Sequence, residues 1–295
     1  MKVLCIGHVT YDVMINMNDY PIENTKNRAK SVTACGGGQV SNASYLLGKW
    51  GINTHILGLV GNDDYGKVIK KELESVNVNT RYLEMNGNST VSYIIVNSKN
   101  GSRTILTYHN DDLLLHDIEE DINPDIILMD GYEYEMSLKI IKKYPKAIKV
   151  LDAEKNNERV LNLCKLVDYV ICSKPFLEKF SNIIISGEES IKKALVYANK
   201  YFKNIIVTLE EDGCAYNGKI ISTIKVKPVD STGAGDIFHG SFVYGLSKGW
   251  DIEKILLFAN ISASLSVTKL GSRNSVFDIE KVCEVANEFV GSNIY

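Results

Sequence analysis

Short apolar runs alternate with amphipathic segments along most of this chain. Lys2–Gly7 and Thr54–Val60 have the continuous apolar character of buried strands. Gln39–Lys49 carries small or apolar residues at helical spacing, and Asp64–Val76 is a second predicted helix with aspartates at its start. Further predicted elements are strands at Asp125–Met129, Ile148–Asp152, Asp168–Cys172, Asn204–Leu209 and Thr223–Val229, and an apolar helix at Ile237–Leu246. Strands separated by helices predict an α/β fold, with a central parallel sheet covered by helices on both faces.

Two stretches interrupt this alternation, Asp12–Thr33 and Arg81–Tyr108. The second contains runs of period two, Thr90–Val96 and Arg103–Thr107, around a turn at Asn97–Gly101, which is the pattern of an antiparallel hairpin. We expect both stretches to form one small sheet that is inserted into the larger domain and covers the site as a lid. An edge extension or a dimerisation sheet explains the same pattern equally well. No linker or repeat divides the chain, so we predict a single domain over residues 1–295.

Composition narrows the classes of function. The 295 residues are 45% hydrophobic, enough for one large core, and a net charge of −3 gives no general attraction to nucleic acid or anionic membranes. Neither a signal peptide nor an apolar segment of ~20 residues is visible in the sequence. The six cysteines lack C-x-x-C spacing, which favours buried thiols in a reducing compartment. We therefore expect a cytoplasmic protein with neither a membrane nor a nucleic acid as partner.

The strongest chemical signal is the segment Asp230-Ser-Thr-Gly-Ala-Gly-Asp236. Its small residues allow a tight turn, and they leave little side chain to block a ligand. Backbone N–H groups and the macrodipole at the start of the following helix favour an anion such as a transferring phosphoryl group. A carboxylate at the same place, Asp236, can take a proton from an attacking hydroxyl. Helix capping by Asp230 and Asp236 is the alternative interpretation of a glycine-rich string of this kind.

The full string resembles the D-T-x-G-A-G-D signature of the PfkB family of carbohydrate kinases. Segments similar to other family motifs follow in the family's order along nearly the whole chain, at Gly7–Asp12, Gly37–Asn42, Gly58–Gly66 and Thr208–Gly213. The sequence contains no G-x-x-x-x-G-K-[ST] string, so it is not a P-loop kinase. The resemblance implies a ribokinase-like three-layer sandwich, with a mostly parallel central sheet and a small β-sheet lid.

The resemblance also implies a catalytic centre. Asp236 would be the general base, and the backbone N–H groups of Gly233, Ala234 and Gly235 would hold the transferring phosphoryl group. ATP would be the phosphate donor, with Mg²⁺ bridging its phosphate oxygens instead of sitting in a protein cage. Family members often bind a monovalent cation such as K⁺ beside this turn, and its ligands would come from Asp230, Thr232, Gly271 and Ser275.

Binding roles follow from the same resemblance. The acceptor-binding set is Asp12, Gly38, Gln39 and Asn42, together with Arg103 on the lid, which is similar to an arginine that contacts sugar and phosphate in ketohexokinase-like members. From the residues alone, three alternatives stay open: Asp12 as a turn cap, Asn42 as a buried helix amide and Arg103 as an ordinary strand arginine. The nucleotide side comprises Thr208, Glu210, Gly213 and Asn260.

Two positions depart from the family pattern. Many members carry an N-x-x-E motif after the strand that ends here at Cys172, whereas this chain has Ser173-Lys-Pro-Phe176. The missing carboxylate helps to organise magnesium and phosphate in relatives. Glu210 stands where the nucleotide-side motif has a glycine, which should reshape that loop. The Ser-Lys pair, with the G-S-R-T-I and G-G-x-x-S-N strings, is similar to ketohexokinases and favours a fructose-like acceptor.

The sequence leaves three functions to compare. The first is a kinase for a small sugar, a ketose or a furanose. The second is a nucleoside kinase of the adenosine, inosine or pseudouridine type, which an aromatic lid would favour, with Tyr11, Tyr20, Tyr93 and Tyr108 as the lining. The third is a catalytically silent sugar-binding protein, and the presence of Asp236 argues against it. The exposed edges of the inserted sheet favour a homodimer through the lid.

Overall fold

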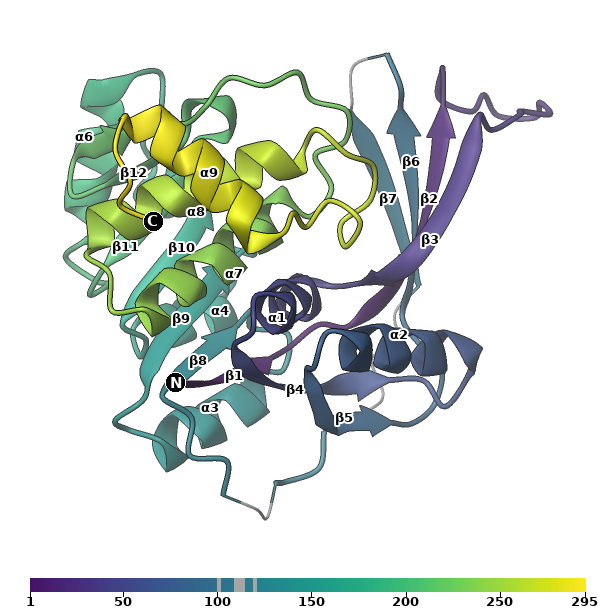
Figure 1. The fold of residues 1–295 in the computed structure, drawn as a ribbon, viewed down its shortest axis with the longest axis horizontal. Helices are drawn as coiled ribbons and strands as arrows, with labels where there is room; N and C mark the ends of the chain where they lie inside the picture. The colour runs from purple at the N-terminus through teal and green to yellow at the C-terminus, as the bar shows by residue number, and fades with distance from the viewer. Residues whose placement is uncertain (100–101, 109–114, 119–120) are drawn as a thin grey trace.

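A nine-stranded sheet runs through the molecule in the order β13-β12-β11-β10-β9-β8-β1-β4-β5 (Figure 1). The computed structural model describes residues 1–99, 102–108, 115–118 and 121–295. The strands from β11 to β5 pair in parallel, whereas β12 and β13 add an antiparallel hairpin at one edge. The strands are β1 (Lys2–Ile6), β4 (Asn53–Val60), β5 (Asn79–Met85), β8 (Ile126–Met129), β9 (Ile148–Ala153), β10 (Tyr169–Ser173), β11 (Ile205–Thr208), β12 (Cys214–Tyr216) and β13 (Lys219–Ile221).

Helices cover both faces of this sheet (Figure 1). Alternate residues of β8 point to opposite layers, because Ile126 and Leu128 pack with α1, α7 and α8 while Ile127 and Met129 pack with α3 to α6. This three-layer α/β sandwich confirms the predicted fold class. One layer holds α1 (Gln39–Lys49), α2 (Asp64–Ser75), α7 (Ala234–Ser247), α8 (Ile252–Ser266) and α9 (Ile279–Val290), and the other holds α3 (Tyr134–Lys143), α4 (Glu158–Cys164), α5 (Lys174–Ser181) and α6 (Glu188–Ala198).

Most predicted elements match the observed ones within one or two residues. The helix predicted at Ile237–Leu246 starts three residues earlier, at Ala234. The predicted strand at Thr223–Val229 is wrong, because residues 223–229 form no strand. The segment leaves the edge strand β13 and passes the end of α8, where the N–H groups of Val229 and Asp230 donate to Val267 O at 2.7 and 3.1 Å. Pro228 has no N–H to offer to a ladder. The apolar run therefore belongs to a segment that crosses the end of α8 and does not pair with a strand.

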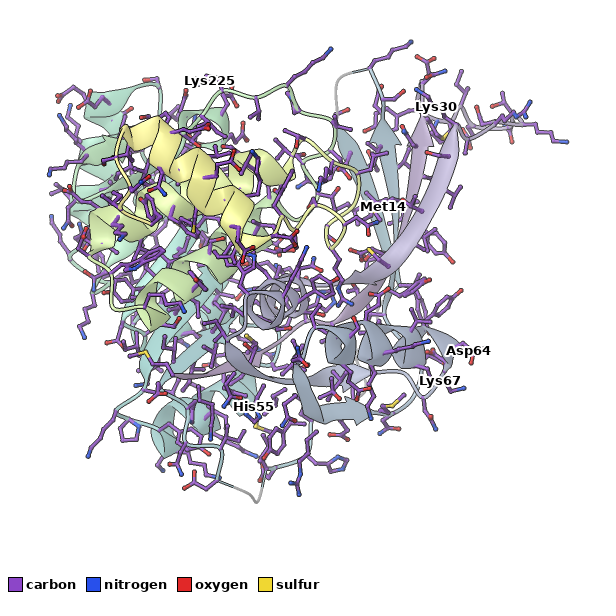
Figure 2. The ribbon with its side chains drawn as sticks, viewed as in Figure 1. Met14, Lys30, His55, Asp64, Lys67 and Lys225 are labelled. Atoms are coloured by element: carbon purple, nitrogen blue, oxygen red, sulfur yellow. The ribbon has the colours of Figure 1, made fainter. Side chains whose placement is uncertain are left out.

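A second sheet of four strands, in the order β3-β2-β6-β7, stands to one side of the sandwich (Figure 1). Two antiparallel pairs, β2/β3 and β6/β7, are joined by a central parallel pair, β2/β6. Met14 is buried on the side toward the main body, and Lys30 lies at the distal end of this small sheet (Figure 2). Its strands are β2 (Thr10–Met17), β3 (Ser31–Gly37), β6 (Val91–Asn97) and β7 (Arg103–Tyr108).

The boundaries of the small sheet differ from the expected ones. Arg81–Met85 belongs to β5 in the main sheet, so the second insertion starts at Val91. The first insertion continues beyond Thr33, because β3 runs on to Gly37 and leads directly into α1. The predicted turn at Asn97–Gly101 lies partly outside the described residues.

Close contact between α1 and α7 brings two distant parts of the chain together. Gly240 of α7 lies against α1, where a Cβ on it would be 3.2 Å from the Cα of Ala43. Two helices approach this closely when a small residue stands at the contact. The N-terminal ends of both helices thereby meet at the edge of the sheet where the parallel strands end.

Candidate active site

Asp236 lies in the first turn of α7, three residues after the helix cap Gly233, which has a φ of +79°. The Asn42 side-chain amide, from α1, donates a hydrogen bond of 2.7 Å to Asp236 Oδ2. Asn42 is buried, and its Oδ1 has no hydrogen-bond partner in the described structure. The structure thus brings together two residues that lie 194 positions apart. It leaves the free Asn42 oxygen available for a ligand hydroxyl.

Buried charge surrounds Asp236. Burial raises its pKa to about 8, and the negative charges of Asp152 and Asp12 act in the same direction, while the Asn42 hydrogen bond and His239 oppose them. His239 Nε2 lies 3.5 Å from Asp152 Oδ1, and its Nδ1 lies 2.6 Å from Gly235 O. Burial also raises the pKa of Asp152 to about 8. A carboxyl group that titrates near neutral pH has the basicity that a general base requires.

The turn before Asp236 is open to a ligand. A Cβ on Gly235 would meet no atom within 4 Å, and this residue is exposed. The Ala234 N–H donates to Ser231 O at 3.3 Å, a long bond that a stronger acceptor can replace. On the other side Gly233 is confined, because its Cβ would be 2.7 Å from the Cβ of Ser272. The start of α7 therefore combines the backbone donors of a first helical turn with open space beside Gly235.

The predicted acceptor-binding residues converge on this place from three elements. Asp12 lies on β2, is 6% exposed and accepts a hydrogen bond of 2.6 Å from Thr10 Oγ1. A Cβ on the neighbouring Gly37 would be 2.0 Å from Asp12 Oδ2, so any other residue there would displace the Asp12 carboxylate. Gly38 caps α1 with a φ of +92°. Gln39 Nε2 donates to Glu154 Oε2 at 2.7 Å, a partner at the end of β9.

Asp12 is therefore a strand residue and not a turn cap. Burial raises the pKa of this carboxyl group, while the Thr10 hydroxyl and the charge of Arg273 oppose the shift. A buried carboxylate with one hydroxyl partner keeps acceptor capacity for the hydroxyls of a ligand.

Arg103 reaches the turn before Asp236 from the small sheet. We call this turn, residues 231–235, the phosphoryl turn after its predicted role. It lies on β7, and its guanidinium group donates a short hydrogen bond to Ser231 Oγ. The small sheet and the turn are therefore in direct contact, 128 residues apart in the chain. The exposed guanidinium group of Arg103 can bind an anion at the turn, since its fork of donors matches phosphate geometry.

The predicted nucleotide residues lie around the end of β11 and the edge hairpin. Thr208 ends β11, and Glu210 begins a 3-10 turn, η1 (Glu210–Asp212), with a φ of +55°. Glu210 thus adopts the left-handed conformation that the glycine of the family motif favours, and the loop keeps its turn. A Cβ on Gly213 would be 2.2 Å from Ile221 O. Asn260 Nδ2 donates to Ile221 O at 2.8 Å, so this amide fastens α8 to β13.

Asp230, one of the four predicted cation ligands, has a buried carboxylate that contacts two of the others. Asp230 accepts backbone N–H bonds from Thr232 and Gly271, both at 2.9 Å. The Thr232 hydroxyl is buried and has no hydrogen-bond partner in the described part of the chain. Ser275 Oγ donates to Ser272 O at 2.7 Å. Across the described residues, no group of three or more His, Cys, Asp or Glu side chains is arranged to hold a metal ion.

Comparison with known proteins decides the family. The family described as pfkB family carbohydrate kinase matches residues 1–279. The chain belongs to this family. As a pfkB family member it is a kinase, that is, a phosphotransferase, and the recognition from the Asp230–Asp236 string is confirmed.

Two curated relatives and a solved structure show how this pfkB family member compares. It is 26% identical over 293 residues to a ribokinase of Bacillus subtilis (strain 168), covering 94% of this chain and 96% of the relative. It is 24% identical to a nucleoside kinase of Methanocaldococcus jannaschii, covering 96% of each chain. The crystal structure of a putative ribokinase from Agrobacterium tumefaciens superposes with a TM-score of 0.88 at 23% identity, covering 98% of both chains. This likeness shows the ribokinase-like fold.

The pfkB family motifs left several site residues unpredicted. Asp130 and Asp152 follow apolar strand runs at the carboxyl ends of β8 and β9, where ligands of parallel sheets bind. Burial raises the pKa of Asp130 to about 7, although His8 N–H and Tyr132 N–H donate to it at 2.8 and 3.0 Å. A carboxylate at the carboxyl end of a buried strand is the signal that could have predicted both. Arg273, whose charge opposes the raised pKa of Asp12, follows no buried strand, so this pattern could not have predicted it.

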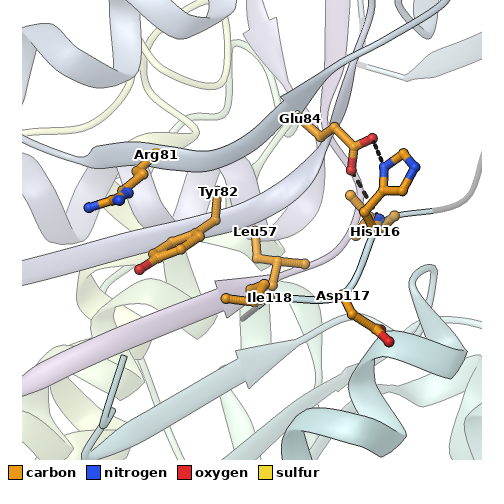
Figure 3. Close-up of a pocket in the computed structure, with 8 residues that line it drawn as sticks. Leu57, Arg81, Tyr82, Glu84, His116, Asp117 and Ile118 are labelled. Atoms are coloured by element: carbon orange, nitrogen blue, oxygen red, sulfur yellow. Dashed lines mark hydrogen bonds and ion pairs between the residues drawn. The ribbon is translucent and has the colours of Figure 1, made fainter. Parts of the chain in front are cut away.

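One cavity of about 300 Å³ lies away from this site (Figure 3). It is lined by apolar Leu57, Tyr82 and Ile118, and by a contact between Glu84 and His116 that Figure 3 shows as dashed lines. Leu57 packs in the core shared with α3 to α6, whereas Asp236 lies on α7 in the opposite layer. The cavity contains none of the residues predicted for the active site.

Proposed function

We propose that this kinase transfers the γ-phosphoryl group of ATP to a hydroxyl of a small sugar, a ketose or a furanose. The observation that carries the proposal is the Asp236 carboxylate, held by Asn42 beside the open turn at the start of α7. A base and a set of anion-binding donors in one place suit phosphoryl transfer to an alcohol.

The chemistry follows from these positions. The acceptor hydroxyl binds among Asp12, Gln39 and Asn42, with its proton directed at Asp236. Asp236 accepts that proton as the hydroxyl oxygen attacks the γ-phosphorus, the bond to the β-phosphate oxygen breaks, and ADP leaves. The N–H groups of the turn and the Arg103 guanidinium stabilise the negative charge on the transferring group. The small sheet acts as a lid that keeps water from the reacting phosphoryl group.

Two cations belong to the proposal. Mg²⁺ would arrive with ATP, held by the nucleotide and not by a protein cage, and would supply positive charge to the transferring phosphoryl group. A monovalent cation such as K⁺ fits beside the turn, where the buried Thr232 hydroxyl lacks a hydrogen-bond partner. Gly271 donates to Asp230, and Ser275 lies in the loop that follows Gly271. A cation between this loop and Asp230 would stabilise the turn.

The test is ADP release against a panel of sugars and nucleosides. We expect a small sugar to give the highest kcat/KM, and Asp236→Asn to lower kcat about 10³-fold because the base is lost. Binding of ATP should change by less than about twofold, since the carboxylate acts on the acceptor proton. Asp64→Asn, an exposed carboxylate at the start of α2, is the matched control. Retention of more than about a tenth of kcat in Asp236→Asn would remove Asp236 from the role of base.

A nucleoside kinase is the second candidate, supported by the similarity to the Methanocaldococcus jannaschii relative. A nucleoside site was expected to be lined by tyrosines. Three of the four tyrosines lie on the other face of the small sheet, which favours the sugar instead. Tyr11 is the neighbour of Asp12 along β2, so its side chain points to the opposite face. Val91 is the cross-strand partner of both Tyr11 and Tyr108, so Tyr108 lies on that opposite face too. Tyr93 pairs with Val13 on that same opposite face. A nucleoside giving the highest kcat/KM would reverse this choice, and sugar binding without ADP release would support a silent binding protein.

A homodimer through the small sheet completes the proposal. The face opposite to Asp12 is apolar and exposed at Val32, Tyr93, Leu106 and Tyr108. A second copy of the same sheet would cover this face and the free edge of β7.

The free cysteine thiols fit a reducing compartment such as the cytoplasm. In the described residues no helix has the length and apolar character of a membrane span.

A further inference from the structure

Arg273 is a charged residue inside the protein, with an exposed fraction of 4%. It lies on the bridge loop, which we define as Gly271-Ser-Arg-Asn-Ser275. A buried guanidinium group requires a carboxylate and hydrogen-bond acceptors to offset its loss of hydration. The partners of Arg273 therefore reveal which parts of the molecule it holds together.

These partners come from three elements around the root of the small sheet. The guanidinium group donates to Glu72 of α2 through Nη1, and to Ser41 Oγ of α1 through Nη2 at 2.6 Å. The same Glu72 oxygen accepts the backbone N–H of Gly36, at the end of β3, at 2.8 Å. A Cβ on Gly36 would be 2.1 Å from Nη1 of Arg273. Glycine at this position thus lets the guanidinium group lie directly against the strand.

The other end of the bridge loop contacts the phosphoryl turn. The Gly271 N–H donates to Asp230, and the Cβ of Ser272 lies 2.7 Å from where a Cβ of Gly233 would be. The loop also contacts the small sheet, since Ser272 Oγ is 3.9 Å from Cys35 Sγ. One short loop therefore links the turn, the main body and the strand that carries the root of the small sheet.

We propose that Arg273 is a positioning residue, which fixes the root of the small sheet against the phosphoryl turn and so keeps acceptor-binding Asp12 at a constant distance from Asp236. The physical basis is that Asp12 pairs with Cys35 across β2 and β3, next to Gly36. A shift of β3 at its root must move Asp12 with it. The consequence for acceptor binding rests on the proposed function, whereas the anchoring of the sheet does not.

The variant Glu72→Gln tests this anchoring, because it keeps the size of the side chain and removes the charge that Arg273 requires. Amide hydrogen exchange of β2 and β3, measured without any ligand, should accelerate about tenfold, with exchange of β10 unchanged. Ser41→Ala removes one hydrogen bond and leaves the ion pair, so a smaller acceleration in the same strands is expected. In steady-state kinetics, Glu72→Gln should raise KM for the acceptor about tenfold and leave KM for ATP within about twofold.

Asp278→Asn is the matched control. Asp278 likewise forms an ion pair, with its Oδ1 3.0 Å from Nζ of Lys49 on α1, but that pair lies away from the small sheet. This variant should leave both exchange and KM unchanged. Unaltered exchange of β2 and β3 in folded Glu72→Gln would overturn the proposal, and so would equal acceleration in β10, which indicates general loss of stability. If no acceptor is phosphorylated by the wild-type protein, the proposed function fails, and the exchange data still decide the role of Arg273.

Discussion

At the scale of single residues, the site is a group of carboxyl groups, of which Asp130 and Asp152 are buried and Asp236 is half-buried beside the open turn. Asp130, Asp152 and Asp236 have pKa values raised to about 7, 8 and 8, and burial is the largest cause for each. The negative charge of Asp152 raises the pKa of both Asp130 and Asp236, so ionisation of one carboxyl group disfavours ionisation of the others. Asp236 has an advantage, because the Asn42 amide hydrogen-bonds to its ionised form.

The pH dependence of catalysis follows from this arrangement. Asp236 accepts a proton only when ionised, so kcat/KM should rise as the pH increases from about 6.5 and level off above its pKa of about 8. Asp152→Asn removes a like charge, which lowers the pKa of Asp236 and moves the rising limb by roughly one unit to lower pH. Rate profiles from pH 6 to 10 measure both effects. Asp64→Asn should leave the limb in place, and an unmoved limb in Asp152→Asn would contradict the coupling.

At the scale of elements, helix starts decide where the functional groups lie. The aspartates before α2 were predicted to favour its N-terminus, and Asp63 indeed caps the helix by accepting Gly66 N–H at 2.8 Å. Asp63 also accepts Ser89 N–H at 2.8 Å, so the cap joins α2 to the segment before β6. Desolvation alone would raise the pKa of Asp63, but these hydrogen bonds together outweigh it, and the pKa is lowered. The helix that carries Glu72 is thereby fixed to the start of the small sheet.

Removal of this cap should therefore destabilise the protein. We expect Asp63→Ala to lower the free energy of unfolding by about 2 kcal/mol, since a cap and a second backbone hydrogen bond are lost together. Denaturant unfolding followed by circular dichroism measures the change. Asp64→Ala is the neighbouring control, because this side chain is 94% exposed and pairs only with Lys67 in the described structure (Figure 2). An equal loss in both variants would show that charge near the helix start matters and the cap does not.

At the scale of the whole molecule, the small sheet has two faces of different character. The inner face carries Asp12 and Met14 toward the main body, and the outer face presents apolar side chains to solvent. Tyr93 and Leu106 are directly opposed across β6 and β7, with exposed fractions of 43% and 58%. An apolar surface of this kind on a sheet with a free edge is typical of an interface.

Leu106→Glu tests the homodimer. A buried carboxylate at the centre of the interface should shift the protein from dimer to monomer, which light scattering detects as half the mass. Ile184→Glu is the control, because Ile184 is 83% exposed and follows α5 on the main body. A wild-type protein that is already monomeric at micromolar concentration would contradict the proposed dimer.

The sequence by itself determined the elements and the family. Periodicity located the parallel strands and helices because burial on both faces leaves continuous apolar runs. It failed at Thr223–Val229, where an apolar run meets the end of α8 instead of a strand. The glycine-rich string located Asp236 because a turn of this kind tolerates few other residues.

Tertiary structure alone decided which distant residues meet. The bond from Asn42 to Asp236, the contact of Arg103 with Ser231 and the burial of Arg273 against Glu72 each join segments more than a hundred residues apart. Local sequence carries the preference for a helix, a strand or a turn, because those depend on neighbouring residues. Contacts between elements, and the pKa shifts that burial imposes, arise only when the packed layers exclude water, so no window of the sequence contains them.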